Sequence, residues 1–124
     1  MYKTITREQL KKIIEEDKNV RIVDVLSREH YAKEHIRGAV SIPLEDLRRD
    51  AFKFLKRNER IIVYCASFSC QASTKAAKIL VSLGFSDVSD YKGGIADYKE
   101  DKTLALEEGA YSSPGFSHGC CGCY

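Results

Sequence analysis

The stretch from Arg60 to Gly84 constrains the fold of this chain more than any other. It opens with the apolar run Ile-Ile-Val-Tyr at residues 61–64, which predicts a short buried strand. It closes with alanine, isoleucine and leucine residues at helical spacing, and Gly84 then stands where a helix can stop. Between these parts lie Cys65 and Cys70, among small and polar side chains. The stretch therefore predicts a strand, a loop with two thiols, and a helix.

This loop has the features of a site for a nucleophile. The first N–H groups of a helix have no partners within the helix, and together with the helix dipole they favour an anion at the helix N-terminus. We expect a cysteine at such a point to be held as the thiolate, which is its reactive form. The sequence therefore predicts that Cys65 is a nucleophile. The alternative is a structural role, since free cysteine is among the most buried residue types.

Strand and helix patterns alternate along the rest of the chain. The predicted strands cover residues 2–5, 20–25, 40–42, 61–64 and 86–91. A first helix is predicted to follow Thr6, which with Gln9 resembles a capping box. Further helices are predicted over residues 27–33, 43–56, 72–83 and 95–99, and a turn over residues 35–39. This alternation predicts an α/β fold with a mainly parallel sheet. Ligands of such sheets bind at the carboxyl ends of the strands, where Asp24 and Cys65 are expected to lie.

Composition limits the function classes further. The chain has 124 residues, 31% of them charged and 44% apolar, and a formal net charge of +2, which predicts one globular domain that binds neither nucleic acid nor membrane. The N-terminus lacks the apolar stretch of a signal peptide, so we expect a cytoplasmic protein with reduced thiols. Residues 1–102 are the predicted domain, and residues 103–124 a flexible tail rich in glycine, serine and cysteine.

Several short motifs, in order along residues 3–100, resemble those of single-domain rhodaneses, a family of sulfurtransferases. They are Ile-Val-Asp-Val at 22–25, a His-Ile-Arg-Gly-Ala run that leads to Ile-Pro at 42–43, Ile-Val-Tyr-Cys at 62–65, and Tyr-Lys-Gly-Gly at 91–94. The resemblance implies a rhodanese-like fold, which is a mainly parallel five-stranded sheet with helices on both faces. It also implies that Cys65 takes a sulfane sulfur from a donor, forms a persulfide, and passes the sulfur to a thiol acceptor without a cofactor.

The resemblance also implies a set of residues that bind substrate. In the family, backbone amides of the loop after the cysteine cradle the bound sulfur. Carried onto this sequence, that loop supplies Ala66, Ser67, Phe68, Ser69, Gln71 and Ala72. The donor is expected to be thiosulfate or a persulfide.

The sequence departs from the family pattern at three places. If Ser73 matches the residue that usually follows the loop, this loop is longer than usual, and residues 66–74 contain no arginine or lysine. Leu26 and Tyr98 stand where the family often has arginine and tryptophan. A loop without charge favours a persulfide donor over the dianion thiosulfate. It also disfavours a phosphatase or arsenate reductase, because Gln71 stands where an arginine would grip the oxyanion.

The remaining cysteines leave alternatives open. Cys70 is either a space-filling residue or a second catalytic thiol that resolves the Cys65 persulfide, which would make the protein a thiol-disulfide or persulfide reductase. Cys120, Cys121 and Cys123, with His118 nearby, form either a soft-metal site, a thiol relay tethered to the domain, or a tail without a role. In the metal or carrier interpretation, the domain would be a non-catalytic sulfur carrier or metal-binding module.

Overall fold

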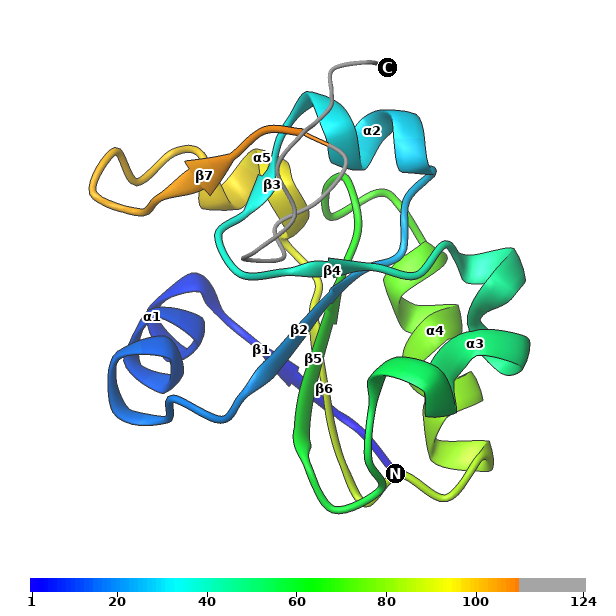
Figure 1. Cartoon of the computed structure of the whole chain (residues 1–124). Helices are drawn as coiled ribbons and strands as arrows, with labels where there is room; N and C mark the ends of the chain where they lie inside the picture. Colours follow the sequence, from blue (N-terminus) through cyan, green and yellow to red (C-terminus); the bar gives the residue numbers. More distant parts are fainter. Residues whose placement is uncertain (110–124) are drawn as a thin grey trace.

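A five-stranded parallel sheet forms the centre of the computed structural model, which describes residues 1–109 (Figure 1). Its strand order is β1-β6-β5-β2-β4. The strands are β1 (Lys3–Ile5), β2 (Arg21–Asp24), β4 (Val40–Ser41), β5 (Arg60–Tyr64) and β6 (Asp87–Tyr91). The pairs Asp24–Tyr64 and Tyr64–Tyr91 bring the carboxyl ends of β2, β5 and β6 to the same level. The predicted parallel α/β sheet is confirmed.

Helices cover both faces of the sheet, and the side chains of β5 alternate between them. Helices α3 (Leu47–Phe54) and α4 (Ala72–Ser82) pack on one face, in a core that includes Ile61 and Val63. Helices α1 (Arg7–Glu16), α2 (Arg28–Lys33) and α5 (Gly94–Tyr98) belong to the other side, whose core includes Ile62 and Tyr64 (Figure 1). A strand buried on both faces reads as a continuous apolar run, which explains the sequence of residues 61–64.

Capping residues fix where the first two helices begin. Thr6 and Gln9 exchange two hydrogen bonds, from Thr6 N–H to Gln9 Oε1 at 2.8 Å and from Gln9 N–H to Thr6 Oγ1 at 3.2 Å, which is the predicted capping box. Ser27 Oγ accepts a bond from His30 N–H at 3.3 Å at the start of α2. The predicted helix over residues 43–56 is instead a 3₁₀ turn, η1 (Leu44–Asp46), followed by α3. Pro43 keeps an extended ψ of 148° and so lies outside the helix.

A small second sheet has no counterpart among the elements predicted from the sequence. Residues 35–39, predicted as a turn, begin with β3 (His35–Ile36), which pairs antiparallel with β7 (Leu106–Glu107). Gly109 N–H donates to the carbonyl of Ala32 at 2.8 Å, so the chain runs back over α2 beyond the expected boundary at residue 102. The cysteines at 120, 121 and 123 and His118 lie outside the described residues. Within residues 1–109, no helix is long and apolar enough to cross a membrane.

Candidate active site

Cys65 follows directly after β5, the middle strand of the sheet, and its solvent exposure is 0%. Its Sγ lies 3.4 Å from the carbonyl oxygen of Cys70 and 3.4 Å from Ser73 Oγ, at the start of α4. Burial raises the pKa of the Cys65 thiol, and a hydrogen bond with the Cys70 side chain raises it further, while hydrogen bonds with Ser73 act in the opposite direction. Cys65 is therefore held as a buried thiol in the resting site.

Cys70 is the partner of Cys65 and lies closer to solvent. It is half-buried, and its N–H donates to Ser67 O at 3.0 Å in the turn at the tip of the loop. Burial acts to raise the pKa of the Cys70 thiol. Hydrogen bonding with the Cys65 side chain and with the N–H groups of Ala66 and Ala72, together with the nearby charge of Lys92, outweighs burial, so the pKa of Cys70 is lowered overall. The pKa of Cys65 is thus shifted in the direction opposite to the one expected for a thiolate at this point, and the converging donors lower the pKa of Cys70 instead.

The first turn of α5 holds the start of the loop. Ile95 N–H donates to the carbonyl of Cys65 at 2.9 Å, and Ala96 N–H donates to that of Ala66 at 3.0 Å. These are among the N–H groups that a short helix cannot satisfy by itself. The close approach requires a glycine at residue 94, because a Cβ there would lie 2.4 Å from Cys65 O and because its φ is +66°. Gly94 thus lets α5 and the loop share hydrogen bonds.

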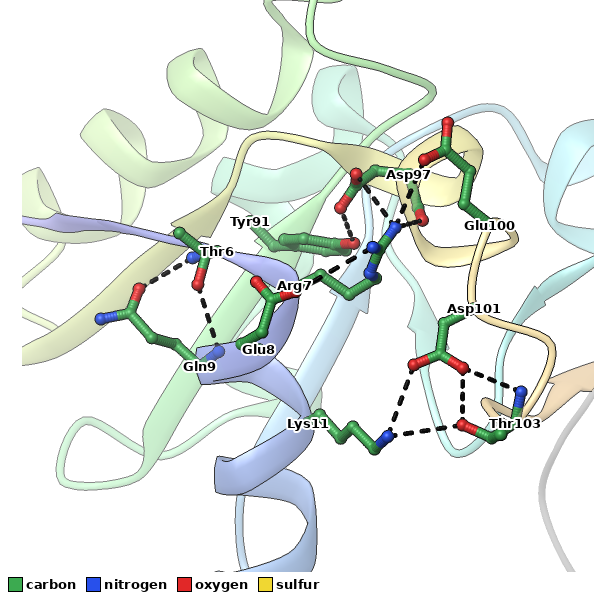
Figure 2. Close-up of polar contacts among 10 residues, drawn as sticks. All are labelled: Thr6, Arg7, Glu8, Gln9, Lys11, Tyr91, Asp97, Glu100, Asp101 and Thr103. Atoms are coloured by element: carbon green, nitrogen blue, oxygen red, sulfur yellow. Dashed lines mark hydrogen bonds and ion pairs between the residues drawn. The ribbon is translucent and has the colours of Figure 1, made fainter.

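Figure 2 shows the cluster of polar side chains that anchors α5. Arg7, in the first turn of α1, donates from Nη1 to the carbonyl of Asp97 at 2.8 Å and contacts Asp97 Oδ1 at 3.3 Å and Glu100 Oε1 at 3.4 Å. Tyr91, at the end of β6, donates to Asp97 Oδ2 at 2.6 Å. Helix α5 is therefore tied both to α1 and to the sheet, which fixes the groups that hold the cysteine loop.

Lys92 is a site residue that sequence reasoning missed. It follows β6, and its Nζ donates to the carbonyl of Cys70 at 2.9 Å and to Thr74 Oγ1 at 3.0 Å. Thr74 in turn donates to Asp90 Oδ2 at 2.9 Å. The sequence position of Lys92 could have indicated this role, because Lys92 precedes the Gly-Gly turn and so follows a strand that ends at the same edge of the sheet as the strand before Cys65. The loop, which has no cationic residue of its own, thus receives a positive charge from the residue that follows β6.

The other loop residues predicted to bind substrate lie between Cys65 and the first turn of α4. Ala66, Ser67 and Ala72 are half-buried, whereas Phe68, Ser69 and Gln71 are exposed. Phe68, at the tip of the loop, is 65% exposed. It also lines a pocket of about 310 Å³, together with Lys92, Gly93, Tyr91 and Arg7. The loop therefore offers amides around the thiols and an aromatic ring outside them, and the substrate-binding role of these residues stays a prediction.

Asp24 and His35 support the framework of this face. Asp24 is buried and accepts bonds from Leu26 N–H at 2.9 Å and from the Tyr64 hydroxyl at 2.8 Å. The hydroxyl of Tyr64 itself accepts a bond from Ile36 N–H at 3.0 Å, which joins β5 to β3. His35 stacks on Tyr31 with ring centroids 3.7 Å apart. Within residues 1–109, no three histidine, cysteine or acidic side chains converge as metal ligands would.

The sequence model of the protein family described as "Rhodanese-like domain" matches residues 6–101 of this chain. The matched residues include every strand of the five-stranded sheet except β1, and they include the site just described. The chain belongs to the rhodanese-like family. The resemblance inferred from short motifs is thus confirmed, together with the rhodanese-like fold.

Two proteins that are similar to this chain carry names that refer to sulfur. The chain is 33% identical over 94 residues to the Bacillus subtilis (strain 168) protein named "Putative sulfur carrier protein YrkF", covering 76% of this chain and 49% of that protein. It is 34% identical over 76 residues to thiosulfate sulfurtransferase PspE of Escherichia coli (strain K12), covering 60% of this chain and 70% of that protein. The chain therefore spans about half the length of the first of these relatives.

A solved structure agrees with the fold. The crystal structure of the Alr3790 protein from Anabaena sp. superimposes with a TM-score of 0.77 at 33% identity, over 85% of this chain and 80% of that one.

Tyr98 of the present chain stands where the family often has tryptophan. The ring of Tyr98 is buried, and its hydroxyl donates to Ala105 O at 2.7 Å, so it helps to hold the segment that leads into β7.

The close contact at Gly94 predicts a specific loss of stability. Gly94→Ala should lower the free energy of unfolding by more than about 2 kcal/mol, because it adds backbone strain and a clash with the Cys65 carbonyl. Gly38→Ala is the matched control, since Gly38 has a φ of +84° but a Cβ there would meet nothing within 4 Å, so only the strain of about 1 kcal/mol applies. Equal losses in urea denaturation of the two variants would contradict the account.

The two thiols should differ in reactivity. At pH 7, limiting iodoacetamide should alkylate Cys70 faster than Cys65 by at least about ten-fold, because Cys70 is more exposed and its pKa is lowered while that of Cys65 is raised. Peptide mass spectrometry at several times measures both rates. The ratio of the Cys70 rate to the Cys65 rate should fall as the pH rises beyond 9, the ordinary pKa of a cysteine thiol, because Cys65 then ionises as well. Faster alkylation of Cys65 at pH 7 would contradict the assignment.

Proposed function

We propose that this domain is a sulfurtransferase that moves a sulfane sulfur from a donor to a thiol acceptor through a persulfide on Cys65. The observation that carries the proposal is the position of Cys65. It lies at the carboxyl end of the middle strand, beneath a loop whose amides converge on a pair of thiols. Convergent N–H groups stabilise a sulfur anion such as a persulfide. The names of the relatives support sulfur chemistry of this kind.

The reaction has two half-reactions, and no cofactor is needed for either. In the first, the sulfur–sulfur bond of the donor breaks, its remainder leaves with the bonding electrons (as sulfite from thiosulfate), and the sulfane sulfur becomes bonded to Cys65 Sγ. In the second, the outer sulfur forms a bond with the acceptor sulfur, and Cys65 leaves as the thiolate. The resting Cys65 thiol donates to the Cys70 carbonyl, and the neighbouring Cys70 side chain can accept its proton as a thiolate. A reducing compartment such as the cytoplasm would keep both thiols available.

Mass spectrometry tests the proposal directly. Incubation with thiosulfate, or with a low-molecular-weight persulfide, should add about 32 Da, one sulfur atom, and peptide analysis should find it on Cys65. Addition of a thiol acceptor should remove the adduct, and cycles of loading and release should exceed one per protein molecule. A single stoichiometric release would favour the sulfur-carrier interpretation. No adduct on any cysteine with either donor would contradict the proposal.

Lys92 makes thiosulfate a better donor than the loop sequence alone suggests. Its ammonium group is bonded to the loop carbonyl of Cys70, and Lys92 lines the pocket beside Phe68, where an anionic donor can approach. A charge-assisted hydrogen bond contributes about 1.5–3 kcal/mol. We therefore propose that Lys92 supplies the positive charge that the loop itself lacks.

Removal of this charge should change the preference between donors. Lys92→Met should lower kcat/KM with thiosulfate by about ten-fold or more, and with an alkyl persulfide, which carries at most one negative charge, by less, because the dianion depends more strongly on the ammonium group. Lys78→Met is the matched control, since Lys78 is exposed on α4. Steady-state assays with both donors measure the effect. An equal loss with both donors would show that Lys92 only holds the loop in shape.

A further inference from the structure

We propose that Cys70 is the thiol through which sulfane sulfur enters and leaves the site, and that Cys65 is the buried thiol that stores it. This inference rests on the proposed function and adds to it a second catalytic residue, one that bonds the transferred sulfur atom itself. The observations that carry it are the different burial of the two thiols, the hydrogen bond from the Cys65 thiol to the Cys70 carbonyl, and the hydrogen bond from Lys92 to that same carbonyl.

Burial makes Cys65 a poor point of contact for a reactant from solvent. Thiol exchange requires the attacking sulfur to reach the sulfur that it attacks, and its rate depends on access. The exposure of Cys65 is 0%, and the residue is enclosed by Ser73 and by the backbone of Cys70. Cys70 is half-buried at the open side of the loop, beside the exposed residues Phe68 and Ser69. A donor or acceptor can therefore reach Cys70 without opening the loop.

The Cys65 thiol is in contact with the backbone of Cys70. Its Sγ lies 3.4 Å from the Cys70 carbonyl oxygen, to which it donates, so the Cys65 sulfur faces the second cysteine. A sulfane sulfur on Cys65 takes the place of that hydrogen and so lies next to Cys70. Lys92 Nζ donates to the Cys70 carbonyl at 2.9 Å, and its charge, together with the N–H groups of Ala66 and Ala72, lowers the pKa of the Cys70 thiol. Two of the amides expected to cradle the bound sulfur thus favour the thiolate form of Cys70, the form that attacks a donor.

Each step balances without an oxidant or a reductant. The Cys70 thiolate attacks the outer sulfur of thiosulfate, a sulfur–sulfur bond forms, and sulfite leaves with the electron pair of the broken bond. Cys65 then attacks the outer sulfur of the Cys70 persulfide, its proton passes to the departing Cys70 sulfur, and the persulfide is now on Cys65. Release to an acceptor thiol runs through the same steps in reverse order, with the acceptor attacking a Cys70 persulfide.

A different reaction of the same pair would have a different product. If Cys70 attacked Cys65 Sγ rather than the outer sulfur, a disulfide between Cys65 and Cys70 would form and hydrosulfide would leave. That reaction would consume an external thiol reductant in every cycle. The relay through Cys70 conserves the oxidation state of the sulfur and so fits transfer to an acceptor.

Single substitutions separate these possibilities. The parent is the full chain with Cys120→Ser, Cys121→Ser and Cys123→Ser, so that Cys65 and Cys70 are the remaining thiols. With thiosulfate, Cys70→Ser and Cys70→Ala should both load Cys65 at least about ten-fold more slowly than the parent, and should discharge it to an acceptor thiol correspondingly slowly. The Cys65→Ser variant should gain about 32 Da on Cys70, because it lacks the storage thiol but keeps the thiol that meets the donor.

Three results would overturn the inference. One is loading and discharge of the Cys70 variants at the parent rate, and another is the absence of an adduct on Cys70 in the Cys65→Ser variant. The third is a loaded parent that ends about 2 Da below its unloaded mass as hydrosulfide appears, since that marks disulfide formation. Thermal unfolding of each variant provides the check on folding. If the parent loads Cys65 and the Cys70 variants load it equally fast, only the relay through Cys70 is rejected. If the parent never loads, the proposed function itself is rejected.

Discussion

The site depends on a close contact between two segments that are remote in sequence, the loop after β5 and the first turn of α5. Two hydrogen bonds, Ile95 N–H to Cys65 O at 2.9 Å and Ala96 N–H to Ala66 O at 3.0 Å, hold the base of the loop. They can form because residue 94 has no Cβ. The Arg7–Asp97–Tyr91 cluster then fixes α5 against α1 and β6. The backbone of Cys65 is thus held by hydrogen bonds from α5 that a glycine makes possible, while its side chain contacts Cys70 O and Ser73 Oγ.

The chemistry of the loop follows from how this framework distributes burial and charge. Cys65 lies at the bottom of the loop and is buried, whereas Cys70 is half-buried, its carbonyl accepts a hydrogen bond from the Cys65 thiol, and loop amides lower the pKa of its own thiol. The positive charge comes from Lys92, which the parallel pairing of β5 and β6 brings to the same edge of the sheet. Anion stabilisation in this domain therefore acts on the pair of thiols rather than on Cys65 alone.

Local patterns predicted most of the fold. The apolar run at 61–64, the capping residues Thr6 and Ser27, and the alternation of strands with helices each have a physical cause within a few residues, and the structure confirms the elements that they predict. The pairing of β3 with β7 was missed, because a two-residue strand has no periodicity and its partner is far away in the chain. Pattern alone likewise extended a helix back to Pro43, where the structure has a 3₁₀ turn.

The site was predicted in part, and the limits have the same origin. The position of Cys65 after a buried strand was sufficient to assign it to the functional edge of the sheet. The direction of its pKa shift differs from the expected one, because burial and the neighbouring thiol are tertiary features. Lys92 acts across strands, so its role emerged only from the packing of β6 beside β5.

A crystal structure of the protein after incubation with thiosulfate would test the central claim most directly. The account predicts an additional sulfur atom bonded to Cys65 Sγ, lying towards Cys70 and among the loop amides, with α5 still bonded to the Cys65 carbonyl. An additional sulfur found only on Cys70, or a Cys65–Cys70 disulfide in its place, would contradict the claim that Cys65 stores the sulfur.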